Sequence, residues 1–181
     1  MALTRETLVL GVNDAKISEL LVDTAVTLTY GPLIDVPGIT KLEVTPSITE
    51  KDLRGDEKIL DIHTKLEFVE WSFENSRLSL DALAVLLGGT VASSGVTPNQ
   101  VNTYTLTADD VPKYFKLEGK ADYTDAGDMH IVLYKCKASS ASYALQGEEY
   151  AKVSASGKAI ATVKNNKVKD VVINETAKAI V

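Results

Sequence analysis

Hydrophobic and polar residues alternate from residue 58 to residue 73 with the two-residue period of a β-strand. One side of this strand is mainly apolar and carries Leu60, Ile62, Thr64, Leu66 and Phe68. The apolar positions then shift by one residue, to Val69, Trp71 and Phe73. A β-bulge, or a bend where the strand leaves one sheet for another, would account for this shift.

A helical period follows this long strand. Ser79 is a favourable N-cap, and Asp81 complements the positive N-terminal end of a helix. Apolar residues then recur at helical spacing, at Leu80, Leu83, Ala84 and Leu87. Gly88–Gly89 supplies the left-handed conformation that commonly ends a helix. The pattern therefore predicts one short helix over 80–87, with Leu83 and Leu87 facing a sheet.

Several other segments have strand character. They are 24–30, 39–45, 114–123, 129–138, 149–163 and 168–173. The segment 129–138 is apolar on both sides, as expected of a central strand. The pattern predicts a mostly β protein, an antiparallel β-sandwich or partly open barrel of about seven or eight strands with one short flanking helix.

The remaining segments lack a clear period. We expect residues 1–23 to form an N-terminal arm that becomes ordered against a partner, and residues 174–181 to form a C-terminal tail. Residues 47–57 are polar and predict an inter-strand loop longer than most hairpin connections. Residues 90–101 also read as a loop. The whole chain, 1–181, is the size of a single domain.

Composition narrows the class of protein. A net charge of −6 argues against a nucleic-acid-binding module, which usually carries a basic patch. The single cysteine excludes an internal disulfide. The N-terminal residues lack the apolar region of a signal peptide, and no apolar run approaches the roughly 20 residues of a membrane span. We therefore expect synthesis in a cytosol and no membrane insertion.

Candidate chemistry is sparse. His63 and His130 have no cysteine or carboxylate at metal-ligand spacing, and His63 is expected on a polar surface. Cys136 alternates with apolar residues and is expected in the core. The acidic residues between 50 and 57 lack the regular spacing of an EF-hand loop. The sequence therefore predicts no catalytic, cofactor or metal site, and no enzyme activity.

Two segments resemble the tail tube (major tail) proteins of long-tailed bacteriophages. Residues 35–91 read DVPGITKLEVTPSITEKDLRGDEKILDIHTKLEFVEWSFENSRLSLDALAVLLGGTV, and residues 114–138 read YFKLEGKADYTDAGDMHIVLYKCKA. The resemblance covers most of the chain from about residue 24 and is weakest before it. It implies a β-sandwich with a flanking helix, found in rings of typically six subunits. These rings stack into a hollow tube through which the genome passes, and the family has no catalytic residues.

The resemblance also implies partners and a location. The main partner would be further copies of the chain, together with other phage tail proteins such as the tape measure, terminator and distal tail proteins. Double-stranded DNA would pass transiently without specific binding. The protein would be located in the virion, as part of the phage tail, after synthesis in the cytoplasm of the host bacterium. It would need no cofactor.

Two sets of residues are candidates for these contacts. The loop 47–57 suits contacts between stacked rings through Lys51, Asp52, Arg54, Asp56 and Glu57. The polar sides of two strands suit the lumen of the tube, through Asp61, Lys65, Glu67, Glu118 and Asp122. The mixed charges of the second set predict weak binding of DNA phosphates.

Two other classes of function share this architecture. One is a soluble β-sandwich binding module for a carbohydrate or a receptor, and the other is a small β-barrel enzyme. A binding module usually presents exposed aromatic residues, whereas Phe68, Trp71 and Phe73 lie in the apolar phase of their strand. The sequence offers the enzyme no nucleophile, base or metal set.

Overall fold

The computed structural model describes residues 9, 11–55, 57–122, 127–145 and 152–180. This part of the chain contains ten strands and one helix, so the predicted mostly β class is confirmed and the predicted strand count was too low. In chain order the elements are β1 (Asp14–Asp23), β2 (Leu28–Asp35), β3 (Ile39–Gly55), β4 (Lys58–Asn75), α1 (Leu80–Leu86), β5 (Thr90–Ser94), β6 (Val101–Thr105), β7 (Tyr114–Asp122), β8 (Asp128–Ala144), β9 (Lys152–Ala159) and β10 (Lys169–Asn174).

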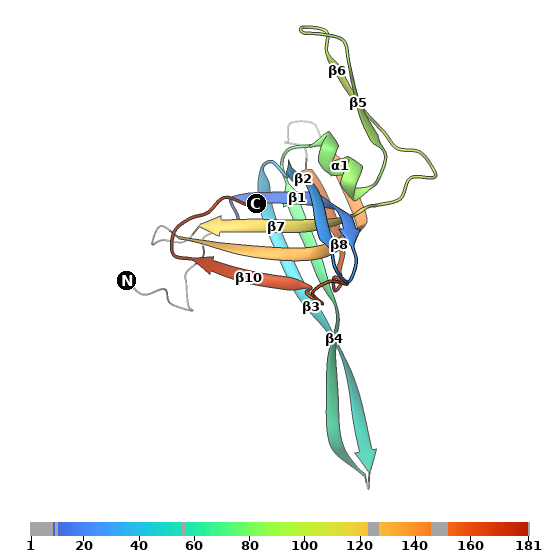
Figure 1. Cartoon of the computed structure of the whole chain (residues 1–181), viewed down its shortest axis with the longest axis vertical. Helices are drawn as coiled ribbons and strands as arrows, with labels where there is room; N and C mark the ends of the chain where they lie inside the picture. Colours follow the sequence, from blue (N-terminus) through green and yellow to red (C-terminus); the bar gives the residue numbers. More distant parts are fainter. Residues whose placement is uncertain (1–8, 10, 56, 123–126, 146–151, 181) are drawn as a thin grey trace.

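Eight of the strands form one antiparallel sheet that is not closed into a barrel. Its order is β2-β1-β7-β8-β9-β4-β3, and β10 also pairs with β8. The first half of β8, residues 128–133, pairs with β10, whereas residues 136–144 pair with β9. β8 thereby joins a front layer (β1, β2, β7 and β10) to a back layer (β9, β4 and β3). Figure 1 shows β7 and β10 crossing β3 and β4 steeply, as in an orthogonal sandwich.

The core lies between the two layers. The Trp71 ring stacks on Phe73 with centroids 5.8 Å apart and meets Phe115 of β7 edge-on at 5.4 Å. Smaller buried residues from both layers surround these rings, among them Ile17, Val69, Leu117, Leu133, Ala155 and Ala159. Cys136 is fully buried among them, so its predicted core position is confirmed.

The helix α1 closes one end of the sandwich. The Ser79 side chain accepts a hydrogen bond from the Ala82 amide, and Gly88 and Gly89 both have φ of +86°, which confirms the predicted start and stop. Its buried residues are Ala82, Leu83, Val85 and Leu86, and Leu87 is only half-buried. Of the predicted stripe only Leu83 is therefore buried, and Leu80, Ala84 and Leu87 are half-buried, so the predicted face was only partly right. The helix contacts β2, β5, β6 and β8. Within the described residues, no helix is long and apolar enough to cross a membrane.

Three segments predicted as irregular are strands. Residues 14–23 of the predicted N-terminal arm form β1, which pairs with β2 and β7, whereas residues 1–8 and 10 lie outside the described part. The predicted loop 47–57 is mostly the second half of β3, paired with β4. Residues 90–101 contribute to the β5–β6 hairpin. In each case the segment pairs with a neighbour whose register its own sequence does not encode.

The strands predicted at 24–30 and 39–45 continue past the prolines that follow those ranges. Strand β3 passes through Pro46, and β2 passes through Gly31 and Pro32. Both strands lie at the ends of the sheet order, and an edge strand tolerates proline because its outer N–H groups need no partner. The predicted bulge is confirmed, and it lies within two residues of the predicted phase shift after Phe68. Ser47 pairs with Phe68 and Ile48 with Leu66, so Glu67 is the extra residue.

Candidate assembly surfaces

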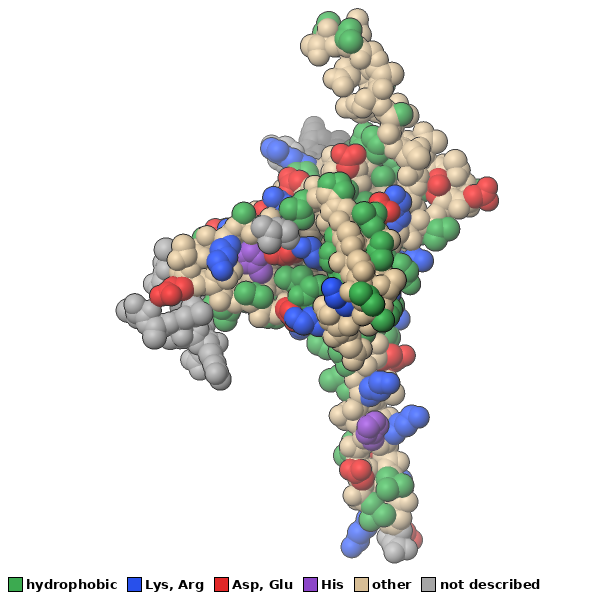
Figure 2. All heavy atoms as spheres, viewed as in Figure 1, with side chains coloured by type: hydrophobic (Ala, Val, Ile, Leu, Met, Phe, Trp, Pro, Cys, Tyr) green, Lys and Arg blue, Asp and Glu red, His purple; other side chains and the backbone are tan. Residues whose placement is uncertain are grey.

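The most prominent surface is a ribbon formed by residues 48–66, which we call the arm. It consists of the distal halves of β3 and β4 and projects well beyond the sandwich (Figures 1 and 2). Pairing runs from Ile48 opposite Leu66 to Gly55 opposite Lys58. At 3.4 Å per residue the ribbon is about 30 Å long. An isolated two-stranded ribbon is at best marginally stable in water.

One face of the arm continues the core side of the back layer. On β3 the series Leu42, Val44, Pro46 and Ile48 is unbroken, and these residues lie opposite Phe73, Trp71, Val69 and Leu66. Farther out, the same face carries Glu50, Asp52, Ile62 and Thr64. Ile48, Ile62 and Leu66 are 59%, 54% and 43% exposed. We call this surface the core-side face of the arm.

The opposite, outer face of the arm is polar. It carries Thr49, Lys51, His63 and Lys65, and the Thr49 hydroxyl donates a hydrogen bond to Glu67 at 2.9 Å. His63 is exposed, which confirms its predicted surface position. The core-side face therefore combines apolar residues with Glu50, Asp52 and Arg54, whereas the outer face is mainly polar and carries Leu53 opposite Asp61 farther out.

The arm contains most of the residues predicted for inter-ring contacts. Lys51, Asp52 and Arg54 are exposed within β3, and Arg54 pairs with Asp52 at 3.6 Å. Glu57 forms the turn with φ of +65°, and Asp56 lies outside the described residues. The structure thus places the described members together, on a ribbon rather than on the predicted loop.

The residues predicted to face a lumen do not share a surface. Asp61 and Lys65 belong to the arm and Glu67 lies in the bulge at its base, whereas Asp122 is exposed at the end of β7 in the front layer. Glu118 is buried, so its predicted solvent position was wrong. Strand alternation alone could not reveal this, because the polar side of β7 is covered by another part of the chain.

Glu118 belongs to a buried charged cluster. Its Oε1 lies 2.7 Å from Nδ1 of His130, and its Oε2 lies 3.2 Å from Nζ of Lys116. On the other side of the imidazole, Nε2 of His130 lies 3.1 Å from Oδ2 of Asp128. Burial by itself lowers the pKa of His130, but the hydrogen bond to Glu118 and the neighbouring carboxylate of Asp128 outweigh it and raise the pKa above its usual value.

Asp128 anchors the C-terminal segment to this cluster. It is fully buried and accepts hydrogen bonds from Nδ2 of Asn174 at 2.7 Å and from the Lys178 amide at 2.6 Å. Lys120 Nζ lies 3.3 Å away. Burial favours a raised pKa, yet these donors hold the pKa of Asp128 well below its usual range. Figure 1 shows the segment after β10 crossing the front layer, and Ile180 is buried, so it is docked rather than a free tail.

The cluster supports structure rather than chemistry. The two carboxylates contact opposite ring nitrogens of His130 and do not converge on one point. Among the described residues, no group of three or more His, Cys, Asp or Glu side chains is arranged to hold a metal ion. Asp128 and His130 stand two residues apart on β8 and so share one side of that strand, but Glu118 of β7 and Asn174 of β10 reach them only through strand pairing, of which the sequence carries no local sign.

A third surface is the outer side of the back layer, which we call the polar face. Across β3, β4 and β9, alternate residues on this side are carboxylates, hydroxyls and lysines: Lys41, Glu43, Thr45, Glu70, Ser72, Glu74, Ser154, Ser156 and Lys158. An open hollow of about 440 Å³ lies on it, lined by Glu43, Glu70, Ser156 and Lys158 among others. The period-two serines of 152–158 were the sequence signal for this face.

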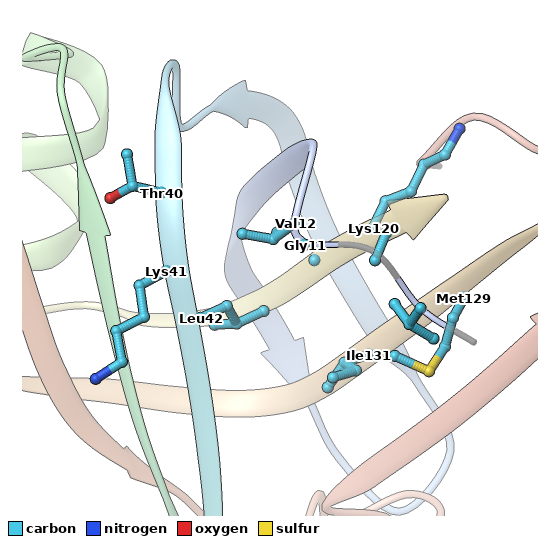
Figure 3. Close-up of a pocket in the computed structure, with 11 residues that line it drawn as sticks. Gly11, Val12, Thr40, Lys41, Leu42, Lys120, Met129 and Ile131 are labelled. Carbon is cyan, nitrogen blue, oxygen red and sulfur yellow. The ribbon is translucent and has the colours of Figure 1, made fainter. Parts of the chain in front are cut away.

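The last surface is an apolar shelf at the free end of the front layer. We define it as Ala121, Met129, Ile131, Val171 and Ile173, which lie on the core side of their strands, together with Val12, which precedes β1 and packs against the core. Ile131 lies opposite both Gly119 and Val171, and Val171 is 51% exposed. Figure 3 shows the adjoining cavity of about 280 Å³, between Leu42 of β3 and Met129 and Ile131 of β8. The back layer does not extend over this end.

The arm, the polar face and the shelf are the features from which a function can be inferred. No protein-family model matches the chain, and no curated protein matches it.

Proposed function

We propose that the chain is a structural subunit that assembles with copies of itself into stacked rings of six, forming the hollow tail tube of a long-tailed bacteriophage. The observation that carries this proposal is the core-side face of the arm. It extends the inner side of the sandwich about 30 Å beyond the body, and no described part of the chain covers it. A surface of this kind is completed by a partner.

The energetics favour many weak contacts over one strong contact. Burying a fully exposed Ile or Leu side chain contributes about 1.5–3 kcal/mol, and covering Ile48, Ile62 and Leu66 would contribute roughly half of that for each, because they are already 41–57% covered. Association of two proteins costs about 4–15 kcal/mol, so a single arm contact would be weak. Rings and stacks repeat the contact, and each added subunit then gains from several contacts at once. Assembly should therefore be steeply dependent on protein concentration.

The polar face supports the conduit part of the proposal. Its strands carry hydroxyls and carboxylates with few lysines, so a lumen lined by it would stay hydrated and would not hold phosphate groups. We assign the lumen to this face instead of the residues predicted from the sequence. The open edges of β3 and β2 are available to join neighbouring subunits side by side. The tape measure, terminator and distal tail proteins remain the other expected partners.

A soluble binding module finds less support. Carbohydrate recognition usually uses an exposed aromatic platform, but Trp71 and Phe73 are buried. Phe68 is half-buried, and the ammonium group of Lys158 lies 3.7 Å from its ring centroid. No enzyme activity is proposed.

Sedimentation velocity and negative-stain microscopy over a range of protein concentrations test the proposal. The wild-type protein should form rings or tubes. A variant in which residues 48–66 are replaced by Asn-Gly should keep its thermal unfolding transition yet remain a monomer. Ile62→Glu on the core-side face should also prevent assembly, whereas Lys65→Glu on the outer face is the matched control and should not. A wild-type protein that stays monomeric at every concentration would contradict the proposed function.

A further inference from the structure

We infer that the C-terminal segment is a strap whose docking depends on the charge of His130, so that it is docked while the imidazole is protonated and detaches when the imidazole becomes neutral. We define the strap as residues 175–180, which follow β10. It lies against the side of the front layer opposite the core, where the Lys178 amide reaches Asp128. This inference does not rest on the proposed function.

The strap and the histidine share one oxygen atom. Oδ2 of Asp128 accepts the hydrogen bond from the Lys178 amide at 2.6 Å, and it also lies 3.1 Å from Nε2 of His130. Oδ1 of the same carboxylate accepts a hydrogen bond from Nδ2 of Asn174 at 2.7 Å, immediately before the strap begins. Asp128 is fully buried, so solvent screens its neighbours only weakly. A change of charge on His130 therefore acts directly on the oxygen that holds the strap.

The two nitrogen atoms of the imidazole are held differently. Nδ1 makes a short hydrogen bond of 2.7 Å with Oε1 of Glu118. Nε2 has no hydrogen-bond partner within the described residues, and its approach to Asp128 is a contact between charges. A neutral imidazole keeps one N–H, which we expect to stay on Nδ1 because the hydrogen bond to Glu118 is well formed. The lone pair of Nε2 then faces Oδ2 of Asp128, and the attraction at that oxygen becomes a repulsion.

The other charged groups on this side of the front layer come from β1, β7, β8, β10 and the strap. Those of the strands form lysine–carboxylate pairs: Lys16 with Asp14, Lys116 with Glu118, Lys120 with Asp122 and Asp128, and Lys167 with Asp170. The strap adds Glu175 and Lys178, which are exposed. Tyr30 and Tyr134 also face this side, and burial raises the pKa of both, so they stay neutral. Lysines and carboxylates ordinarily keep their charges between about pH 6 and pH 9, so among the described residues here His130 is the group whose charge changes.

The direction of the change follows from the two carboxylates. They hold the pKa of His130 above its usual value of 6.5 against the effect of burial. The strap is therefore fully docked below that pH and detaches as pH rises through the folded-state pKa. Residues 175–179 are exposed, and only Ile180 of the strap is buried, so the strap can lift while the sandwich stays folded. Detachment would uncover the carboxylate of Asp128.

Amide hydrogen exchange in dilute full-length protein tests the strap directly. The protection factor is used because it removes the intrinsic dependence of exchange on pH. Protection of the Lys178 amide should fall by about tenfold or more between about pH 6 and pH 9, which corresponds to the loss of a hydrogen bond to a charged group. The midpoint should coincide with the titration of the His130 ring followed by NMR. The Val163 amide is the matched control, because it donates to Asp23 at 2.9 Å, and Asp23 is paired with Lys135 rather than with a histidine.

Two variants assign the effect to His130. His130→Gln keeps a hydrogen-bonding side chain without a titrating ring and should abolish the pH dependence at Lys178, whereas His63→Gln on the exposed arm should leave it unchanged. Constant protection at Lys178 across the titration of His130, an equal loss at Val163, or a loss that persists in His130→Gln would each overturn the inference. The first two comparisons need only the wild-type protein, so they decide the matter even if His130→Gln does not fold. None of these outcomes bears on ring assembly.

Discussion

Asp128 should be among the most costly residues to truncate outside the aromatic core. Replacing it by Ala removes the acceptor for Asn174 and for the Lys178 amide, and it leaves Lys120 and His130 without their shared carboxylate. Breaking a buried ion pair by removing one partner costs about 3–5 kcal/mol. We therefore expect Asp128→Ala to lower the free energy of unfolding by that amount. Because Asn174 and the Lys178 amide hold the C-terminal segment through Asp128, that segment should also detach.

Urea unfolding at low protein concentration measures the loss of unfolding free energy. The single tryptophan, Trp71, is buried in the core and serves as the fluorescent probe. Hydrogen exchange at the Lys178 amide measures the second effect. Asp122→Ala is the matched control, since Asp122 lies opposite Asp128 on β7, is 53% exposed and lies 3.7 Å from Lys120. Its cost should stay below about 1 kcal/mol. A loss for Asp128→Ala no larger than the control, or unchanged exchange at Lys178, would refute this account of the cluster.

Three further predictions concern stability. The two carboxylate neighbours of His130 raise its pKa against the effect of burial. Its contribution to the free energy of unfolding is therefore complete below the unfolded-state pKa of 6.5 and is lost as pH rises through the folded-state pKa. The free energy of unfolding should fall over that pH range, and His130→Gln should make it less dependent on pH. Leu86→Ala should cost about 2–5 kcal/mol in denaturant unfolding, because Leu86 belongs to the buried side of α1, whereas replacement of the exposed Leu78 by Ala should cost far less. Gly157→Ala should lower the melting temperature, because the added Cβ would lie 2.7 Å from the Trp71 ring, whereas Gly31→Ala has no contact closer than 3.7 Å and should be nearly neutral.

The sequence predicts well the parts of the fold whose pattern is local. Residues 114–122 alternate cleanly and form β7, and Ser79 and Gly88 mark the limits of α1 correctly. The phase shift after Phe68 predicts a bulge, and Glu67 is the bulged residue. Each of these features depends on residues within a few positions of one another, so the local sequence contains the necessary information.

The features missed by sequence reasoning depend on distant partners. The second half of β3 has the composition of a polar loop, and it is a strand because β4 returns alongside it. The carboxylates around His130 come from β7 and from the start of β8, so their convergence requires the register of two strands. A proline such as Pro46 would end a central strand but is tolerated in an edge strand. Only the sheet order shows that β3 is an edge strand.

The position of β1 has a consequence for how a new chain folds during synthesis. Residues 14–19 pair with residues 115–120, which leave the ribosome about a hundred residues later. At 5–20 residues per second this interval is roughly 5–20 s. The β3–β4 ribbon, by contrast, joins neighbouring segments and can form as soon as residue 75 is made. Each nascent chain should therefore have a formed arm for several seconds before it has a front layer.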